Sequence, residues 1–161
     1  MSEIKYRQVE ERDHPAVKNM YVELDGFYRQ QGLNFPPVED VGQVWLDSFA
    51  RTLGKFTMLY VAEQDGLVVG FMLARVKRLP PYWGGGMAGT ISDIFVSPQA
   101  RNTGIARGLM DHCLAWLRQQ GVASVDAQVQ VKNSASGALF AIFGFEPELE
   151  QVRLVWGEGS G

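Results

Sequence analysis

The sequence predicts one α/β domain over residues 1–161, built on a mixed β-sheet. Segments in which apolar and polar residues alternate, as in strands, are interleaved with segments that have the three–four spacing of amphipathic helices. One pair of strands is joined by Asp65-Gly66, a strong hairpin signal, which favours antiparallel pairing there. Elsewhere helices separate the strands and favour crossover connections. The predicted order is β-α-α-β-β-β-α-β-α-β, and no repeat or linker divides it.

The composition excludes several classes of function. With 46% hydrophobic and 20% charged residues, the chain is typical of a soluble globular protein. A net charge of −3 gives no basic surface for nucleic acid, and no apolar run is long enough to span a membrane. The polar N-terminus does not resemble a signal peptide, and the single cysteine, Cys113, fits a reducing compartment. We therefore expect a cytoplasmic protein that contacts neither nucleic acid nor membrane, and we predict no metal site.

The first third of the chain is predicted to hold a strand and two helices. Ile4–Val9 alternates as a strand, and Asp13 is placed to cap a helix that ends near Gly32. A second helix follows Pro36-Pro37. It is expected to carry two carboxylates in its first turn and then an apolar face: Glu39, Asp40, Val41, Trp45, Phe49 and Leu53.

The segment between these helices, Asp25–Asp40, is rich in aromatic residues. Phe27 and Tyr28 are therefore candidate substrate-binding residues. An ordinary loop between two helices explains the segment equally well.

Two strands, Phe56–Ala62 and Leu67–Val76, precede an irregular segment, Leu79–Gly89. Its three successive glycines predict a flexible loop, because glycine pays a large entropic cost when it is held in one conformation. Loops beside a site often bind substrate, so Tyr82 and Trp83 are further candidates, with a surface hairpin as the alternative. The next strand is expected at 90–96.

The second half of the chain alternates helices and strands. Ile105, Leu109, Cys113 and Trp116 form one apolar stripe of a helix, which makes Cys113 a buried, inert thiol. The alternation in Val122–Val131 predicts one half-buried strand. Three further features complete the chain: Asn133 as the N-cap of a short helix, Gly144 as its end, and a final strand at Gln151–Trp156.

The turn between the strand at 90–96 and the helix after it is suited to binding an anion. Gly104 allows the backbone to approach a ligand closely, and the N–H groups of Asn102–Ala106 would converge on one point. Arg101 and Arg107 add positive charge that suits phosphate oxygens. The turn lacks the Lys-Ser/Thr pair of a P-loop and the three-glycine spacing of a dinucleotide-binding fingerprint.

Two motifs resemble those of the GNAT acetyltransferase superfamily. Val96-x-Pro98 followed by Arg101-x-x-Gly104-x-Ala106 is similar to its acetyl-CoA pyrophosphate loop, Gln/Arg-x-x-Gly-x-Gly/Ala. Downstream, Asn133, Leu139, Phe140, Gly144 and Phe145 match its Asn…Leu-Tyr…Gly-Phe segment. The predicted strand order also matches, so the resemblance covers nearly the whole chain. It implies a mixed central sheet with splayed central strands and helices on both faces.

The resemblance implies acetyl-CoA as co-substrate and direct attack of an amine on the thioester. Main-chain groups of the central strand would meet the pantetheine arm, the turn would hold the pyrophosphate, and two later residues would lie near the thiol. In order, these cofactor-binding residues are Ile94, Phe95, Val96, Arg101, Asn102, Thr103, Gly104, Ile105, Ala106, Asn133 and Phe140. A strand N–H near Phe95 would polarise the thioester carbonyl.

Two positions depart from the family pattern. Phe140 stands where many members have a tyrosine proposed as general acid, and phenylalanine has no proton to give. Gln128 stands where many have a glutamate base. The remaining candidate is Asp93, in a segment, Ser92–Val96, that resembles the polyamine acetyltransferases. Asp93 is predicted to act as base or amine anchor, and the alternative is an aspartate hydrogen-bonded to neighbouring backbone N–H groups.

The leading functional hypothesis is an N-acetyltransferase that acts on a small-molecule primary amine, with a protein N-terminus or lysine as close rival. A non-catalytic acyl-CoA-binding or sensing module is the alternative, since Phe140 and Gln128 leave the usual proton carriers absent. Homodimerisation through the strand at 151–156 is a further expectation.

Overall fold

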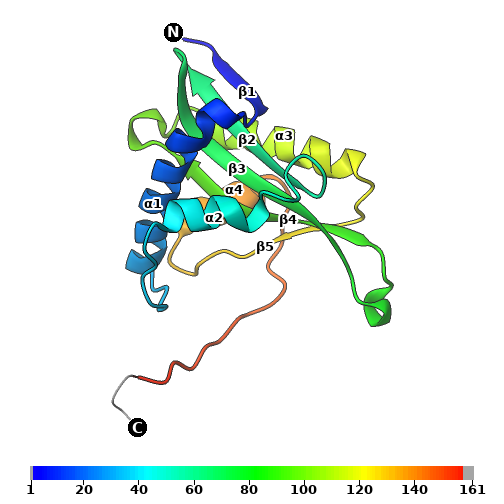
Figure 1. Cartoon of the computed structure of the whole chain (residues 1–161). Helices are drawn as coiled ribbons and strands as arrows, with labels where there is room; N and C mark the ends of the chain where they lie inside the picture. The colour runs from blue at the N-terminus through cyan, green and yellow to red at the C-terminus, as the bar shows by residue number, and fades with distance from the viewer. Residues whose placement is uncertain (1, 158–161) are drawn as a thin grey trace.

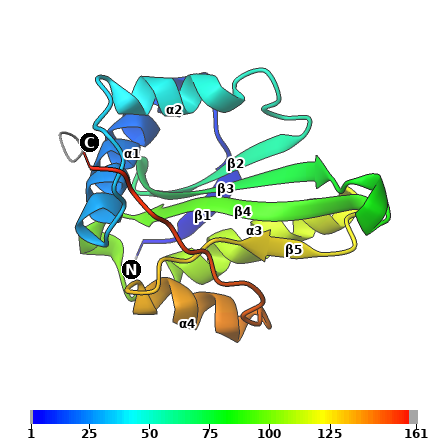
Figure 2. The ribbon, with the colours of Figure 1, turned by 90° about the horizontal axis from the view of Figure 1, so that it is seen from below.

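The computed structural model describes residues 2–157, and Figures 1 and 2 show a central sheet between two layers of helices. The sheet order is β1-β2-β3-β4-β5; neighbours are antiparallel except β4 and β5, which are parallel. Its strands are β1 (Ile4–Gln8), β2 (Thr57–Gln64), β3 (Leu67–Arg78), β4 (Met87–Val96) and β5 (Val125–Ala127). The helices are α1 (His14–Gln30), α2 (Val41–Phe49), α3 (Ile105–Gln119) and α4 (Ser134–Ile142). The predicted mixed α/β fold with helices on both faces is confirmed.

Each face of the sheet has its own core. Strand alternation sends Phe71 and Leu73 toward α1 and α2, where they pack with Trp45 and Phe49. On the other face the alternate strand residues, such as Met72, pack against the apolar stripe of α3. Cys113 lies in that second core and is fully buried, and burial raises the pKa of its thiol, as expected for an inert residue. In Figure 2, α1 and α2 lie above the sheet and α3 below it.

The local signals in the first half gave most element boundaries correctly, but two predictions at the helix starts need correction. Asp13 occupies the N-cap position of α1 as predicted, without the expected bond. The Asp13 side chain makes no cap bond to α1; it accepts bonds from Arg7 at 2.7 and 2.9 Å, and the Arg7 guanidinium holds its pKa below the usual range. Asp40 is the N-cap itself, with φ of 51°, so α2 has no carboxylate in its first turn. The hairpin at Asp65-Gly66 is confirmed, with both residues at positive φ as its turn requires.

Two predicted strands differ in the structure. The strand predicted over 122–131 is reduced to β5, because β5 pairs with β4 only through Gly89, Thr90 and Ile91. The strand predicted at 151–156 is absent: residues 146–156 belong to no helix or strand, and the outermost strand nearest in sequence, β5, is only three residues long and offers a short edge for pairing. In Figure 1 this segment runs below the sheet, where Gln151 accepts a bond from the Gln128 amide at 3.0 Å and the Arg153 guanidinium lies 4.6 Å from the centre of the Phe35 ring.

None of the helices within residues 2–157 is long and apolar enough to cross a membrane. Among the same residues, no cluster of three or more His, Cys, Asp or Glu side chains could hold a metal ion.

Gly42 allows α2 to pack closely on α1, and we expect Gly42→Ala to destabilise the protein by about 1–3 kcal/mol. A Cβ at Gly42 would lie 2.6 Å from the Lys18 carbonyl oxygen, so the two helices would have to separate. Gly26→Ala is the matched control, because a Cβ there meets nothing within 4 Å and alanine favours the helix by about 0.5–1 kcal/mol. Urea unfolding of the three proteins measures both effects; equal stabilities for the two variants would contradict the packing argument.

Candidate active site

A cleft of about 1290 Å³ opens where β4 and β5 diverge. Five parts of the chain line it: α1 with the loop after it, the second half of β4, the turn into α3, the segment after β5, and α4. All but one of the predicted cofactor residues line this cleft, and so do Asp93, Phe27 and Tyr28. The exception is Thr103, whose hydroxyl donates to the Ala100 carbonyl at 2.6 Å. Residues distant in sequence thus form one site.

The divergence of the strands comes from a bulge in β4. The register with β3 shifts so that Leu73 pairs with Asp93 and Ala74 with Ile91, which leaves Ser92 as the extra residue. Pairing with β3 continues to Val96, whereas pairing with β5 stops at Ile91. Beyond the bulge, β4 therefore presents one edge without a strand neighbour to the cleft. The predicted splay of the central strands is confirmed.

Strand alternation determines which main-chain groups face the cleft. The Ser97 N–H donates to the Val69 carbonyl at 2.8 Å, so Phe95, two residues earlier, also directs its N–H and carbonyl toward β3. The groups of Ile94 and Val96 consequently point to the open edge. Ile94 and Val96, rather than Phe95, are positioned to offer hydrogen bonds to an extended ligand. The Val96 carbonyl already accepts a bond from Arg101 Nε at 2.9 Å.

The turn into α3 has the features of an anion site. Asn102 and Gly104 have φ of 63° and 84°, and Gly104 is the residue from which α3 begins. A Cβ at Gly104 would meet no protein atom within 4 Å, so this side of the backbone is open. The first N–H groups of α3 and the positive end of its macrodipole lie at the same place. The turn therefore fits a pyrophosphate such as that of CoA.

The two arginines of the turn differ in availability. Arg101 is engaged with Val96, and its guanidinium lies 5.9 Å from the centre of the Phe95 ring. Arg107 also lines the cleft, and its side chain makes no hydrogen bond or ion pair with residues 2–157. Arg107 is thus the more available cation for a phosphate group.

We therefore expect Arg107→Ala to weaken CoA binding about tenfold, the loss of one charge-assisted bond to phosphate. The effect should shrink as salt is raised, because exposed charges are screened. Arg118→Ala is the control: Arg118 lies on the same helix but outside the cleft. Calorimetric titration with CoA at low and high salt measures the difference, and equal affinities for the two variants would exclude a phosphate contact of Arg107.

The start of α4 closes the cleft opposite the turn. Asn133 is its N-cap as predicted, with Oδ1 accepting the Ser136 N–H at 3.1 Å and Nδ2 donating to the Ser136 hydroxyl at 2.9 Å. Phe140 lies about two helical turns further along α4 and packs edge to face on Phe145, with ring centres 4.9 Å apart. Its ring supplies an apolar wall to the cleft and no proton.

Asp93 lies at the base of the cleft, where it joins three elements. One carboxylate oxygen accepts the Tyr28 hydroxyl proton at 2.7 Å and the other accepts Trp45 Nε1–H at 3.0 Å. Burial raises the pKa of Asp93, while these two donors act in the opposite direction. Burial and the nearby Asp93 charge also raise the pKa of Tyr28, so its proton stays on the phenol. The partners of Asp93 are thus side chains of α1 and α2, and not the neighbouring backbone N–H groups of the alternative prediction.

The wall formed by α1 is aromatic. Phe27 and Tyr28 are joined there by Tyr21 and by two residues of the following loop, Leu33 and Phe35. These three were not among the predicted substrate-binding residues. Arg29 holds this loop against α1 by donating to the carbonyls of Phe35 and Pro36. The sequence signal for Phe35 was the aromatic content of residues 25–40. That the loop folds back onto α1 depends on the contacts of Arg29, which the sequence does not show.

Tyr82 and Trp83 do not line the cleft. They lie at the tip of the β3–β4 hairpin with exposed fractions of 81% and 67%, and Figure 2 shows that tip projecting from the sheet. Because β3 extends to Arg78 and β4 already begins at Met87, the hairpin carries these rings away from the splayed end of the sheet. The structure gives no support to their predicted role in substrate binding.

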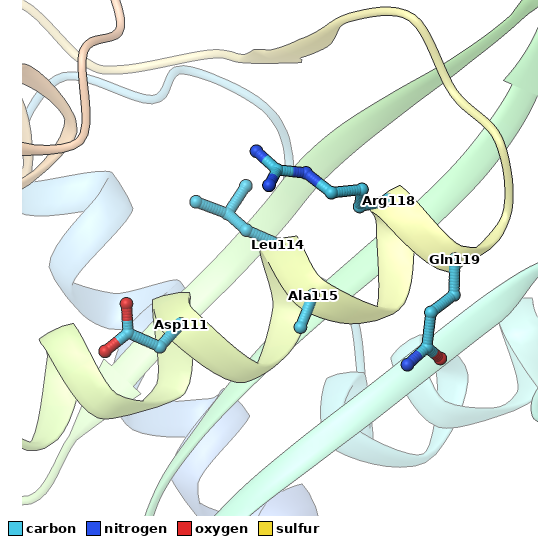
Figure 3. Close-up of a pocket in the computed structure, with 5 residues that line it drawn as sticks. All are labelled: Asp111, Leu114, Ala115, Arg118 and Gln119. Carbon is cyan, nitrogen blue, oxygen red and sulfur yellow. The ribbon is translucent and has the colours of Figure 1, made fainter.

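A second hollow lies on the outward side of α3 (Figure 3). Its lining residues follow one face of that helix: Asp111, Leu114, Ala115, Arg118 and Gln119. In Figure 3 the Arg118 side chain extends over Leu114, while Asp111 and Gln119 lie at opposite ends of the row. They form no converging set of groups. The chemistry of the molecule is therefore best sought in the large cleft.

This combination of a splayed mixed sheet and an anion-binding turn defines an acyl-CoA-dependent transferase, and comparison with known proteins agrees. The family model described as "Acetyltransferase (GNAT) family" matches residues 18–145. The chain belongs to the GNAT acetyltransferase family. Acetyl-CoA is the co-substrate that this membership implies.

Three similar proteins have a named activity or a bound ligand. Ribosomal protein bS18-alanine N-acetyltransferase of Escherichia coli (strain K12) is 26% identical over 98 residues, 61% of each chain. The matched region thus spans less than two thirds of that relative. L-amino acid N-acetyltransferase AaaT of the same strain is 29% identical over 154 residues, 92% of this chain and 86% of AaaT. A predicted acetyltransferase of Clostridium acetobutylicum, solved with acetyl-CoA, has a TM-score of 0.77 at 16% identity, covering 95% of this chain and 96% of its own.

Proposed function

We propose that this protein transfers the acetyl group of acetyl-CoA to the primary amine of a small molecule. The observation that carries the proposal is the single cleft that joins an anion-binding turn at Gly104 to an aromatic wall on α1. The open edge of β4 lies between the two. The thioester would therefore meet an acceptor that is held against α1.

The aromatic wall on α1 favours a compact acceptor. Tyr21, Phe27, Tyr28 and Phe35 can surround a small amine more completely than an extended peptide. The activity named for AaaT, which matches over nearly the whole chain, is on amino acids. The activity named for the bS18-alanine enzyme is on a protein and makes a peptide N-terminus the rival acceptor.

The reaction follows from positioning. The amine lone pair attacks the thioester carbonyl carbon, the C–S bond breaks and CoA leaves as a thiolate. The amine nitrogen gives up a proton to Asp93, directly or through water, or to the leaving thiolate. The N–H groups of Ile94 and Val96 face the cleft and can stabilise the developing oxyanion. Neither Phe140 nor Gln128 can carry a proton. Orientation alone contributes roughly 7–11 kcal/mol in favourable systems, so acetyl transfer does not depend on a tyrosine at position 140.

An amine panel tests the proposal. The protein is incubated with acetyl-CoA and, in turn, L-amino acids, aralkylamines, polyamines, a peptide with N-terminal alanine, and an N-blocked peptide with lysine, while free thiol is measured. We expect at least one small amine to give a higher kcat/KM than either peptide. Preference for a peptide would overturn the small-molecule assignment.

The non-catalytic acyl-CoA-binding module is the second candidate, and the absence of a proton carrier at Phe140 and Gln128 favours it. It predicts tight acetyl-CoA binding with no thiol release for any amine in the panel.

We also propose that the protein is a homodimer. Residues 146–156 are extended, and several large apolar side chains on them are exposed: Leu149, Val152, Leu154 and Trp156. A second copy would cover this apolar surface. Sedimentation analysis is expected to give a dimer that Leu154→Asp weakens, and a monomeric wild-type protein at micromolar concentration would contradict the proposal.

A further inference from the structure

One polar group of the cleft wall is left without a hydrogen-bond partner. Gln130 lies three residues beyond β5 and lines the cleft. Its Oε1 is buried and receives no hydrogen bond from the described residues. A buried acceptor in this state is unfavourable unless a ligand or water satisfies it, so the oxygen marks a place for a donor.

The orientation of the Gln130 amide follows from its other contact. Nε2 donates to the main-chain carbonyl of Tyr28 at 2.9 Å. Turning the amide over would place two acceptor oxygens against each other, so Oε1 must be the atom left without a partner. In Figure 1 the chain after β5 runs toward the C-terminal end of α1, which is where this contact forms.

The location of Gln130 indicates which ligand supplies the donor. The residues that fit acetyl-CoA lie on β4, the turn at Gly104 and α4, whereas Gln130 is bonded to α1. Tyr28, its partner, belongs to the aromatic wall of the acceptor side and also holds Asp93. A donor at Gln130 Oε1 would therefore come from the acceptor.

We propose that Gln130 is a specificity-determining residue that binds the acceptor amine, with Oε1 accepting an N–H of the amine before attack. The inference rests on the proposed acetyltransferase function and adds the residue that recognises the acceptor. An unsubstituted amine carries more N–H groups than a substituted one and can donate one of them to Oε1. Gln130 thus favours primary amines over substituted ones.

Two variants separate this role from a structural one. Gln130→Met removes both the acceptor oxygen and the donor to Tyr28, whereas Gln130→Glu keeps an acceptor oxygen, replaces the donor to Tyr28 by a second oxygen and adds a negative charge. If Oε1 binds the amine, Gln130→Met raises the KM for the amine about tenfold and Gln130→Glu leaves it within about threefold of wild type. If the bond to Tyr28 is what matters, both variants raise KM equally.

Gln31→Met is the matched control, because Gln31 also has a buried Oε1 without a partner but does not line the cleft. It is expected to leave KM unchanged. The amine used is the member of the panel with the highest kcat/KM, and the Kd for acetyl-CoA is measured in parallel for every variant.

Three results would each overturn the role of Gln130 while leaving the proposed function intact. They are equal KM values for wild type and Gln130→Met, equal rises of KM in Gln130→Met and Gln130→Glu, and a loss of acetyl-CoA affinity in Gln130→Met. Thiol release by the wild-type protein with at least one amine would support the proposed function whatever the Gln130 variants show. No release with any amine would overturn the proposed function and this inference together.

Discussion

Gly104→Val is expected to weaken acetyl-CoA binding roughly hundredfold. Gly104 has φ of 84°, a conformation that costs a β-branched residue about 1–2 kcal/mol, and its open side faces the space where the pyrophosphate fits. A valine side chain would both strain the turn and occupy that space. Calorimetric titration of the folded variant with acetyl-CoA measures the loss.

Gly121→Val controls for backbone strain. Gly121 follows α3 at its other end with φ of 79°, and a Cβ there also meets nothing within 4 Å. The two variants should lose similar stability, yet only Gly104→Val should lose affinity for acetyl-CoA. Unchanged affinity in a folded Gly104→Val protein would refute the pyrophosphate assignment.

The second large effect is expected at Asp93, where alanine should cost about 2–4 kcal/mol of stability. Asp93→Ala leaves the buried Tyr28 hydroxyl and Trp45 indole N–H without an acceptor. Asp93→Asn should cost much less, because its Oδ1 can accept from Trp45 and its Nδ2 can donate to Tyr28 once that hydroxyl turns. Thermal unfolding of the two variants at neutral pH tests the order.

The stability difference between Asp93→Asn and wild type should depend on pH, and the raised pKa of Asp93 fixes its sign. Because the pKa of Asp93 is raised in the folded protein, the native state holds the proton more tightly than the unfolded state does. Ionisation of Asp93 therefore lowers stability as pH rises from the usual carboxyl range through the raised pKa. Relative to wild type, Asp93→Asn should gain stability over this interval; a constant difference would indicate that the pKa is not raised.

Activity separates a base from a positioning residue at Asp93. If Asp93 takes the amine proton, kcat/KM of the wild type rises with pH through the pKa of Asp93, and Asp93→Asn loses that rise. If Asp93 only holds Tyr28 and Trp45 in place, the variant keeps the shape of the profile. The geometry, with a donor on each carboxylate oxygen, is compatible with both roles.

Local sequence signals were sufficient to predict the elements that are specified by residues close together in the chain. The amphipathic period of α3, the Asp65-Gly66 hairpin and the Asn133 cap each depend on residues within a few positions, and each is present as predicted. Alternation over 122–131 failed as a predictor of strand length because a strand also needs a neighbour. The bulge at Ser92 removes that neighbour after Ile91.

By itself the sequence determined the fold class, the family and the cofactor-binding turn. The turn can be recognised from sequence because Gly104 and the residues beside it form the anion site with their own backbone groups, without distant partners. Only the tertiary structure decided the acceptor side. Asp93 meets Tyr28 and Trp45 across 65 and 48 residues, and Gln130 meets Tyr28 across 102. Such contacts have no local signature, because they exist only after the splayed sheet brings α1 and the segment after β5 to the two sides of one cleft.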